Sequence, residues 1–253
     1  MKPLYIEDWE LCEGTVRIML LPPKQFLYAT ARISHFLENP VFQSDRFSIG
    51  DVQDHWKSEQ SQQYQEIFFG SNFSGADVVK FSATYPESDR NEYESWLVRE
   101  SASSLPYLYF ALLRSPTIAG SEWNYQCALT LKHEISHAMY YLNREYRSFI
   151  HELWNDVPEG RREYVHSRFS YFYASHRIVD EWAAHILASY EIEQVLDVSA
   201  EGFIELNRQF WKTADRIRFA NTLQSLISCS APAADTMTLS LPDEHLDGVQ
   251  DQI

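Results

Sequence analysis

Cysteine pairs, long apolar runs and basic residues are all scarce or missing in this chain of 253 residues. Cysteine occurs only as Cys12, Cys127 and Cys229, without any C-x-x-C pair. Isolated thiols in odd number argue against a disulfide framework and a thiolate zinc site, and they favour a cytoplasmic protein with reduced cysteines. Because no apolar stretch reaches about 18 residues, we predict no membrane-spanning helix.

Basic residues are outnumbered, since 21 Lys and Arg face 36 Asp and Glu and the formal charge is −15. Such a chain is repelled by phosphate backbones and by anionic lipid, so we expect neither nucleic acid nor a membrane as its partner. A basic peptide or protein would be attracted. The acidic start and the short apolar run at 16–21 do not fit a secretory signal. Signal-independent export, for example of an effector, is the alternative to a cytoplasmic location.

What the chain does contain favours a folded protein, because 45% of its residues are hydrophobic and 15% are aromatic. The first 120 residues mix strand-like and helical patterns. They include a strand at Thr15–Leu21, a helix at Lys24–Leu37, a polar stretch of surface helix and loops at Ser44–Gly75, and a strand or short helix at Tyr107–Leu113. The N-terminal half is therefore expected to hold a small mixed sheet.

From Trp123 onward the pattern is mostly helical, with one helix at Trp123–Leu142 and another at Gly202–Ile227. The sequence thus predicts an α+β fold with a mostly helical C-terminal half. We expect one domain over residues 1–230, made of an α+β subdomain (1–120) and a helical subdomain (121–230). Residues 231–253 contain several acids but no Lys or Arg, which is typical of a flexible acidic tail.

The most informative segment is H-E-x-x-H, from His133 through Glu134 to His137, inside the helix predicted at Trp123–Leu142. Two imidazoles four residues apart lie one turn above the other, where a single Zn²⁺ can bind both at about 2.0–2.1 Å. The glutamate between them is close enough to reach a water on that metal. Opposite the two histidines runs an apolar stripe of Cys127, Leu131, Ile135, Ala138 and Leu142. A pair of solvated histidines on a surface helix is the alternative.

A catalytic zinc site needs a third protein ligand besides water. The metzincin extension of the motif is ruled out, because Tyr140 stands where that pattern requires glycine. Glu181 is the best candidate, since the small residues that follow it in its predicted helix allow close approach to the first helix. Asp180 is a competing ligand or a group that orients one, and His185, one turn after Glu181, can also orient a ligand through its ring. The remaining candidates are His151, His166 and His176.

His133-Glu134-x-x-His137, followed by Glu181 in a downstream helix, resembles the gluzincin group of zincin-type zinc metallopeptidases, the thermolysin-like proteins and their distant relatives. The resemblance covers residues 123–188. It implies a zincin-like fold, Zn²⁺ held by His133, His137 and Glu181, and Glu134 as general base. Many members carry an acid one turn after the ligand glutamate, where this chain has His185.

The leading hypothesis is therefore a zinc metalloendopeptidase of narrow specificity that hydrolyses a peptide or protein with metal-activated water. Tyr173 or His176 is the candidate donor to the oxyanion that forms. Two alternatives stay open: a zinc hydrolase acting on something other than peptides, and a non-catalytic binding protein that retains a zincin fold. The oligomeric state is left open.

Overall fold

The computed structural model describes residues 2–43, 45–60, 69–102, 108–115, 120–188 and 199–230. It confirms the predicted fold class, with a four-stranded mixed sheet in the N-terminal part and a mostly helical C-terminal half. Residues 231–253, for which the sequence predicts an acidic tail, lie outside the described residues. In the part of the chain that is described, no helix is long and apolar enough to cross a membrane.

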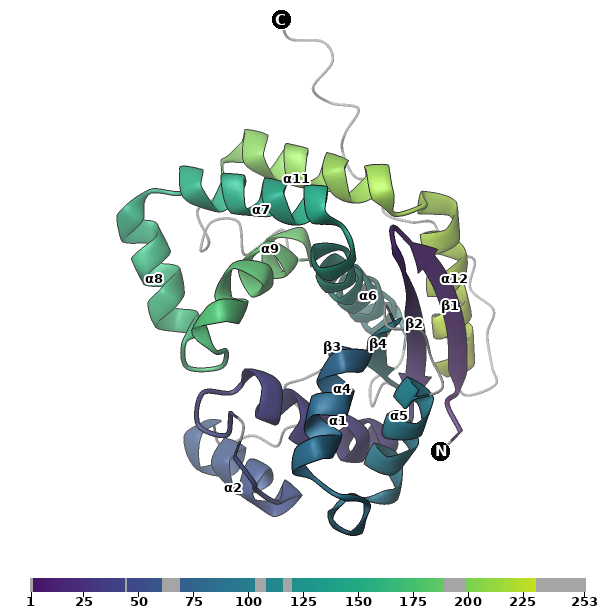
Figure 1. Cartoon of the computed structure of the whole chain (residues 1–253). Coiled ribbons are helices and arrows are strands. Elements are labelled where there is room, and N and C mark those ends of the chain that lie inside the picture. The colour runs from purple at the N-terminus through teal and green to yellow at the C-terminus, as the bar shows by residue number, and fades with distance from the viewer. Residues whose placement is uncertain are drawn as a thin grey trace, which may run out of the picture.

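The sheet has the strand order β1-β2-β4-β3 (Figure 1). Strands β1 (Tyr5–Leu11) and β2 (Gly14–Leu21) form an antiparallel hairpin. Strand β4 (Leu108–Arg114) runs parallel to β2, and β3 (Gly70–Ser74) pairs antiparallel with β4. The short strand β3 therefore forms one edge of the sheet that the structure describes.

Both faces of the central strands are buried, because their side chains alternate between two hydrophobic clusters. In β2, Val16, Ile18 and Leu20 point into one cluster, whereas Met19 and Leu21 point into the other. Strand β4 alternates in the same way, and all of its residues are buried. A strand that is buried on both faces has a continuous apolar sequence instead of alternating apolar and polar residues. That pattern is why the sequence left Tyr107–Leu113 open between strand and helix, and the structure shows a strand from Leu108 onward.

Helices cover the two faces of this sheet (Figure 1). The long helix that carries the motif lies on the face of the first cluster, against β4 and β3, and a shorter helix packs beside it. On the first face lie α6 (Ser121–Leu142), α7 (Arg144–Asp156), α9 (Ile178–Ala188), α11 (Ala200–Thr213) and α12 (Arg216–Ser230), with α8 (Glu159–Phe169) and the 3₁₀ turn η2 (Ser175–Arg177) between α7 and α9. On the second lie α1 (Pro23–Glu38), α2 (Ile49–Gln60), α4 (Gly75–Thr84) and α5 (Glu92–Ala102), with the 3₁₀ turn η1 (Glu87–Asp89).

Two segments differ from the sequence-based expectation. The helix predicted at Gly202–Ile227 is two helices, α11 and α12, because the chain breaks at Ala214 and Asp215 restarts it as a cap. The Asp215 carboxylate accepts a hydrogen bond of 2.9 Å from the backbone N–H of Arg218, which satisfies a free donor of the new first turn. The polar stretch Ser44–Gly75 contains the predicted surface helix, α2, but it also contains all of β3, which is too short to show alternation.

The second face is held partly by a buried ion pair between α1 and α5. Arg32 binds both carboxylate oxygens of Glu94, whose side chain is fully buried, and also donates a hydrogen bond of 2.8 Å to the carbonyl of Asp89. We expect Glu94→Ala to lower the free energy of unfolding by about 3–5 kcal/mol, because it leaves a buried guanidinium without its anion. Chemical denaturation measures this loss.

The matched control is Asp8→Ala, which removes the partner of Arg17 in a pair whose acid is 40% exposed. Water and salt screen this pair, so the loss should stay below about 1 kcal/mol. Equal losses for the two variants would contradict the structural role given to the Arg32–Glu94 pair.

Candidate metal centre

Packing of α6 against α9 brings together side chains that are far apart in the sequence. The Nε2 atoms of His133 and His137 lie 3.0 Å from each other. The Oε2 atom of Glu181 lies 3.7 Å from each of these two nitrogens. Because residues four apart share one helical face, the two imidazoles lie one turn apart on α6, in edge contact with each other. Both face the carboxylate of Glu181 on α9.

His185 belongs to the same cluster. One ligand atom from each of His133, Glu181 and His185 lies within 4.8 Å of the others, so this group can hold a metal ion. The Nε2 atom of His185 is 3.9 Å from Glu181 Oε2, and its ring makes an edge contact with the ring of His133. His185 is about one third exposed, whereas Glu181 is buried. The sequence placed His185 beside the centre, and the structure adds it to the possible ligands.

The donor atoms fit a small tetrahedral cation. Bonds of about 2.0–2.1 Å at tetrahedral angles separate neighbouring ligand atoms by about 3.3 Å, close to the spacing of His133, His137 and Glu181. The buried Oε2 of Glu181 also has no hydrogen-bond partner among the described residues. An orphaned buried carboxylate oxygen beside two imidazole nitrogens is the arrangement that a bound cation would satisfy.

Asp180 contacts His137 of this cluster, and Arg177 contacts Asp180. Asp180 Oδ1 lies 2.9 Å from Nδ1 of His137, although that N–H is not aligned with it for a hydrogen bond. The guanidinium of Arg177 lies 4.0 Å from the other oxygen of Asp180 and donates a hydrogen bond to the hydroxyl of Tyr141. A carboxylate on one ring nitrogen holds the other nitrogen toward a metal and makes it more basic. Asp180 therefore lies against Nδ1 of His137, while Nε2 of the same ring faces His133 and Glu181.

Burial dominates the electrostatics of the centre. It raises the pKa of Glu134 to about 7 and the pKa of Glu181 to about 8, since a carboxylate without water disfavours its charge. Burial also lowers the pKa of His185 to about 4. His137 is the exception, because burial is outweighed there by the charges of Asp180 and Glu181, which raise its pKa to about 10. The centre thus gathers carboxyl groups whose negative charge is costly without a cation beside them.

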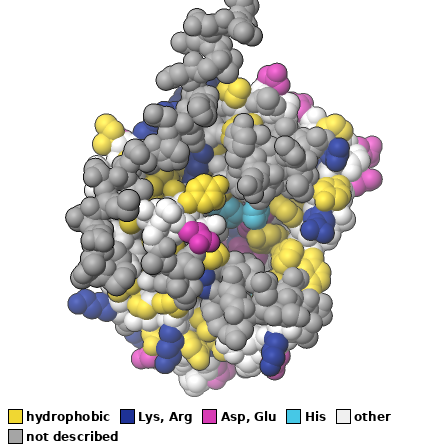
Figure 2. Space-filling view, turned by 180° about the vertical axis from the view of Figure 1, so that it is seen from behind, with side chains coloured by type: hydrophobic (Ala, Val, Ile, Leu, Met, Phe, Trp, Pro, Cys, Tyr) yellow, Lys and Arg dark blue, Asp and Glu magenta, His cyan; other side chains and the backbone are white. Residues whose placement is uncertain are grey.

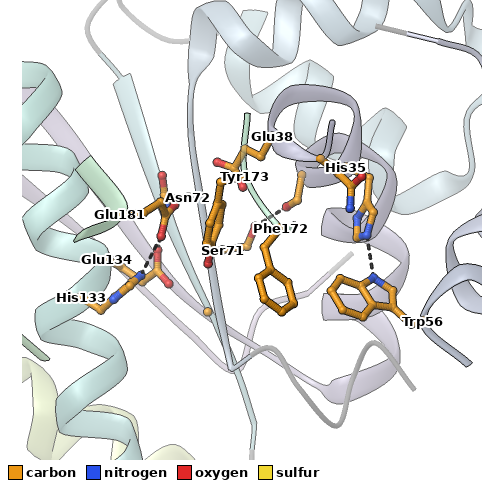
Figure 3. A pocket seen from close by; sticks show the side chains of 13 residues that line it. His35, Glu38, Trp56, Ser71, Asn72, His133, Glu134, Phe172, Tyr173 and Glu181 are labelled. Carbon is orange, nitrogen blue, oxygen red and sulfur yellow. Dashed lines mark hydrogen bonds and ion pairs between the residues drawn. The ribbon is translucent and has the colours of Figure 1, made fainter. Parts of the chain in front are cut away.

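Glu134 is connected to the sheet by a relay of two hydrogen bonds, from Tyr109 to Asn72 and from Asn72 to Glu134. The side-chain amide of Asn72, on β3, donates a hydrogen bond of 2.9 Å to Glu134 Oε2. The hydroxyl of Tyr109, on β4, donates a hydrogen bond to the carbonyl oxygen of the same amide, which fixes the direction in which Asn72 points. Figure 3 shows Asn72 and Glu134 facing each other beside His133. The carboxylate therefore keeps one oxygen bound, and the sheet sets its orientation.

Two hollows meet at this centre and share His133, Glu134 and Tyr173 in their walls. A groove of about 550 Å³ leads to it from α6, α8 and α9. A cavity of about 70 Å³ continues beyond it toward α1 and α2, with Gly70 to Asn72 of the edge strand along its wall (Figure 3). Figure 2 shows histidine side chains at the floor of a hollow that apolar side chains surround. The centre is thus reached from outside, while Glu134, His137 and Glu181 are buried.

The structure brings together most of the residues that the sequence selected. His133, His137, Asp180, Glu181 and His185 converge, and Glu134 and Tyr173 lie beside them. The other candidate donor, His176, is exposed and lines neither hollow. The alternative third ligands do not join the centre either, since His151 binds the Tyr140 hydroxyl and His166 packs on Trp154.

Sequence reasoning missed Glu38, Gly70, Asn72 and Tyr109. They lie in elements whose proximity to the motif depends on sheet pairing and on the packing of α1, and no local pattern marks them. Comparison of the chain with protein-family models, with curated proteins and with solved structures finds no match. The site therefore rests on its own geometry and chemistry.

Gly70 allows the edge strand to approach α6 closely. A Cβ atom at this position would lie 2.0 Å from Glu134 Oε1 and 2.7 Å from Thr130 Cγ2. We expect Gly70→Ala to displace Glu134 from Asn72 and to lower the free energy of unfolding by about 1–3 kcal/mol, as overpacking does. Denaturation gives the energy, and a crystal structure of the variant shows the side chain.

Gly160 in α8 is the control, because a Cβ atom there would meet nothing within 4 Å. Gly160→Ala should be neutral or stabilising by up to about 1 kcal/mol, since alanine favours a helix. An unchanged Glu134 position in Gly70→Ala would refute the close-approach explanation.

Proposed function

We propose that this protein is a zinc-dependent endopeptidase of narrow specificity. The observation that carries the proposal is the convergence of His133, His137 and Glu181 on one point, beside the carboxylate of Glu134 and the edge strand β3. The arrangement agrees with the gluzincin-like motif in the sequence.

His133, His137 and Glu181 are the proposed zinc ligands, because their donor atoms are 3.0–3.7 Å apart. Zinc bound there would supply Lewis acidity, lowering the pKa of a water toward about 7 and polarising a carbonyl. Two imidazoles and one carboxylate are ligand types that suit Zn²⁺, and zinc binding would release the proton that the raised pKa of His137 retains. His185 is more exposed and farther from Glu181, so we assign it the role of orienting or assisting the ligands.

Glu134 is the proposed general base, which accepts the proton of the attacking water. Its pKa, which burial raises to about 7, matches this task near neutral pH. The Asn72 amide occupies Oε2, so Oε1 is the oxygen that takes the proton. The relay from Tyr109 through Asn72 keeps the carboxylate from rotating, which holds it close to its reactive geometry.

Tyr173 is the proposed donor to the oxyanion. Burial and then the charges of Glu181, Glu38 and Glu134 hold the pKa of its phenol well above the usual value, so the hydroxyl keeps its proton. It lines both hollows, close to the ligands. A neutral hydroxyl in a site sheltered from water is a strong hydrogen-bond donor to developing negative charge.

A peptide suits the site because an edge strand borders it. Gly70, Ser71 and Asn72 of β3 line the cavity, and β3 pairs with β4 on its other side. An extended chain can add to such an edge through main-chain hydrogen bonds, which places its carbonyls in register with the strand. The groove of about 550 Å³ has a volume typical of ligand sites. Small substrates that lack a main chain would leave the strand edge unused.

Glu134→Gln tests the mechanism most directly. The amide cannot accept the water's proton, but its oxygen can still accept the hydrogen bond from Asn72. We expect turnover of a cleaved peptide to fall about 10²–10⁴-fold while zinc content is unchanged. Kinetics and metal analysis on the same sample measure both. Cleavage at the wild-type rate would refute the role of Glu134.

Removal of the proposed ligands tests the metal centre without any substrate. Alanine at His133, His137 or Glu181 should each abolish stoichiometric zinc binding, measured by metal analysis after dialysis. Zinc at 100 times its dissociation constant should stabilise the wild type by about 2.7 kcal/mol, and these variants should lose that gain. His176→Ala, at an exposed histidine outside the centre, is the control and should behave as wild type.

His185→Ala separates the two possible ligand sets. If His185 only assists, the variant keeps zinc with an affinity about 10–100-fold weaker. Loss of zinc as complete as in His133→Ala would instead make His185 a ligand.

A further inference from the structure

The cavity beyond the metal centre ends at a carboxylate that the mechanism does not use. Glu38 is the last residue of α1, and it lines the cavity together with His133, Glu134 and Glu181. Figure 3 shows Glu38 on the far side of Tyr173 from the centre, with Phe172 and Trp56 along the same cavity. A side chain reaching past the centre into this cavity would meet Glu38.

The carboxylate of Glu38 is buried but poorly satisfied. Its side chain is only 14% exposed, and Oε1 has no hydrogen-bond partner among the described residues. Among the described residues Glu38 pairs with Arg177, whose Nη2 lies 3.8 Å from that oxygen. The same guanidinium also faces Asp77 at 3.9 Å and Asp180 at 4.0 Å. Three carboxylates therefore share one guanidinium, and burial raises the pKa of Glu38, so the charged form of this carboxyl lacks a close cation of its own.

We propose that this cavity receives a basic side chain of the substrate, next to the bond that is cleaved, and that Glu38 recognises its cationic end. The inference rests on the proposed peptidase function and deepens it by naming the substrate class. A buried carboxylate oxygen without a donor gains a charge-assisted hydrogen bond when an ammonium or guanidinium arrives. An apolar side chain would leave that oxygen unpaired, and an acidic one would be repelled.

The dimensions of the cavity suit a slender side chain. The volume of about 70 Å³ is well above the roughly 10–15 Å³ that a single water needs, so the cavity has room for a group larger than one water. A lysine side chain is unbranched and an arginine side chain ends in a flat guanidinium, so both are slender enough to enter it.

The walls of the cavity suit the apolar stem of such a side chain. Trp56 and Phe172 stack on each other, with ring centroids 5.7 Å apart and an interplanar angle of 12°. Both line the cavity, and aromatic surfaces of this kind cover the methylenes of a long basic side chain while its charged end reaches a polar partner. The chain's formal charge of −15 adds a long-range attraction for basic peptides.

Two hydroxamates test the inference by binding alone: lysine hydroxamate and norleucine hydroxamate, whose side chain has four carbons but no ammonium. Each is titrated into the zinc-loaded full-length protein by calorimetry. We expect the lysine compound to bind at least about tenfold more tightly, and we expect Glu38→Gln to remove this preference. Equal binding of the two compounds by the wild type, or no binding of the lysine compound, would overturn the inference.

Glu13→Gln is the matched control, because it makes the same change in charge at an exposed residue of the hairpin turn. It should keep the full preference for lysine, which separates recognition by Glu38 from general attraction to an acidic protein. Zinc content should be unchanged in all variants. If Glu38→Gln does not fold, Glu38→Asp is used instead. It keeps the charge but withdraws it from the cavity, and the preference should fall about threefold or more. Retention of the full preference in the Glu38 variant would also overturn the inference.

The same experiment distinguishes failure here from failure of the proposed function. If the zinc-loaded wild type cleaves no peptide but prefers lysine hydroxamate, the peptidase proposal fails and the recognition of a basic group stands. If it cleaves peptides with equal kcat/KM for lysine and norleucine at every position around the bond, and binds both hydroxamates equally, the peptidase stands and the role of Glu38 fails.

Discussion

The interior around the centre carries more negative charge than its own side chains neutralise. Glu38, Glu134, Asp180 and Glu181 are all largely withdrawn from water, and Arg177 is the one permanent cation that the described ion pairs place against them. Ionised carboxylates in such surroundings are costly unless a cation accompanies them. The raised pKa values of Glu134 and Glu181 express this constraint. A divalent cation between the two imidazoles and Glu181 would relieve it, and a second cation beside Glu38 would relieve what remains.

Two helices and a strand supply the polar groups of the centre. Helix α6 supplies two imidazoles and the carboxylate of Glu134, α9 supplies the carboxylates of Asp180 and Glu181, and β3 supplies the amide that binds Glu134. Each of these elements has apolar residues packed on the sheet or on each other, so the polar groups are positioned by hydrophobic contacts rather than by one another. Rigid elements of this kind hold a site more precisely than loops do.

The residues of the centre that lie on α6 could be predicted from the sequence, whereas those on β3 could not. His133, Glu134 and His137 lie on one helical turn, so the period of the helix alone places them together. Glu181 followed from its residue type and its helical setting, and its distances to both histidines now support that choice. Asn72 and Gly70 gave no signal, because a five-residue strand shows no clear period and its partner β4 lies far along the chain. Glu38 looked like an ordinary acid at a helix end, since its burial depends on the packing of η2 and α2 against α1.

The parallel pairing of β2 with β4 has a consequence for how the centre assembles. Thr15 and Leu108 are partners in this ladder, so the chain must close a long loop before β4 takes its place and β3 can add to it. Contacts between residues so distant in sequence form slowly. The ligand helix α9 follows later still in the order of synthesis. A ribosome-bound chain therefore cannot bring His133 and Glu181 together until its C-terminal half has emerged.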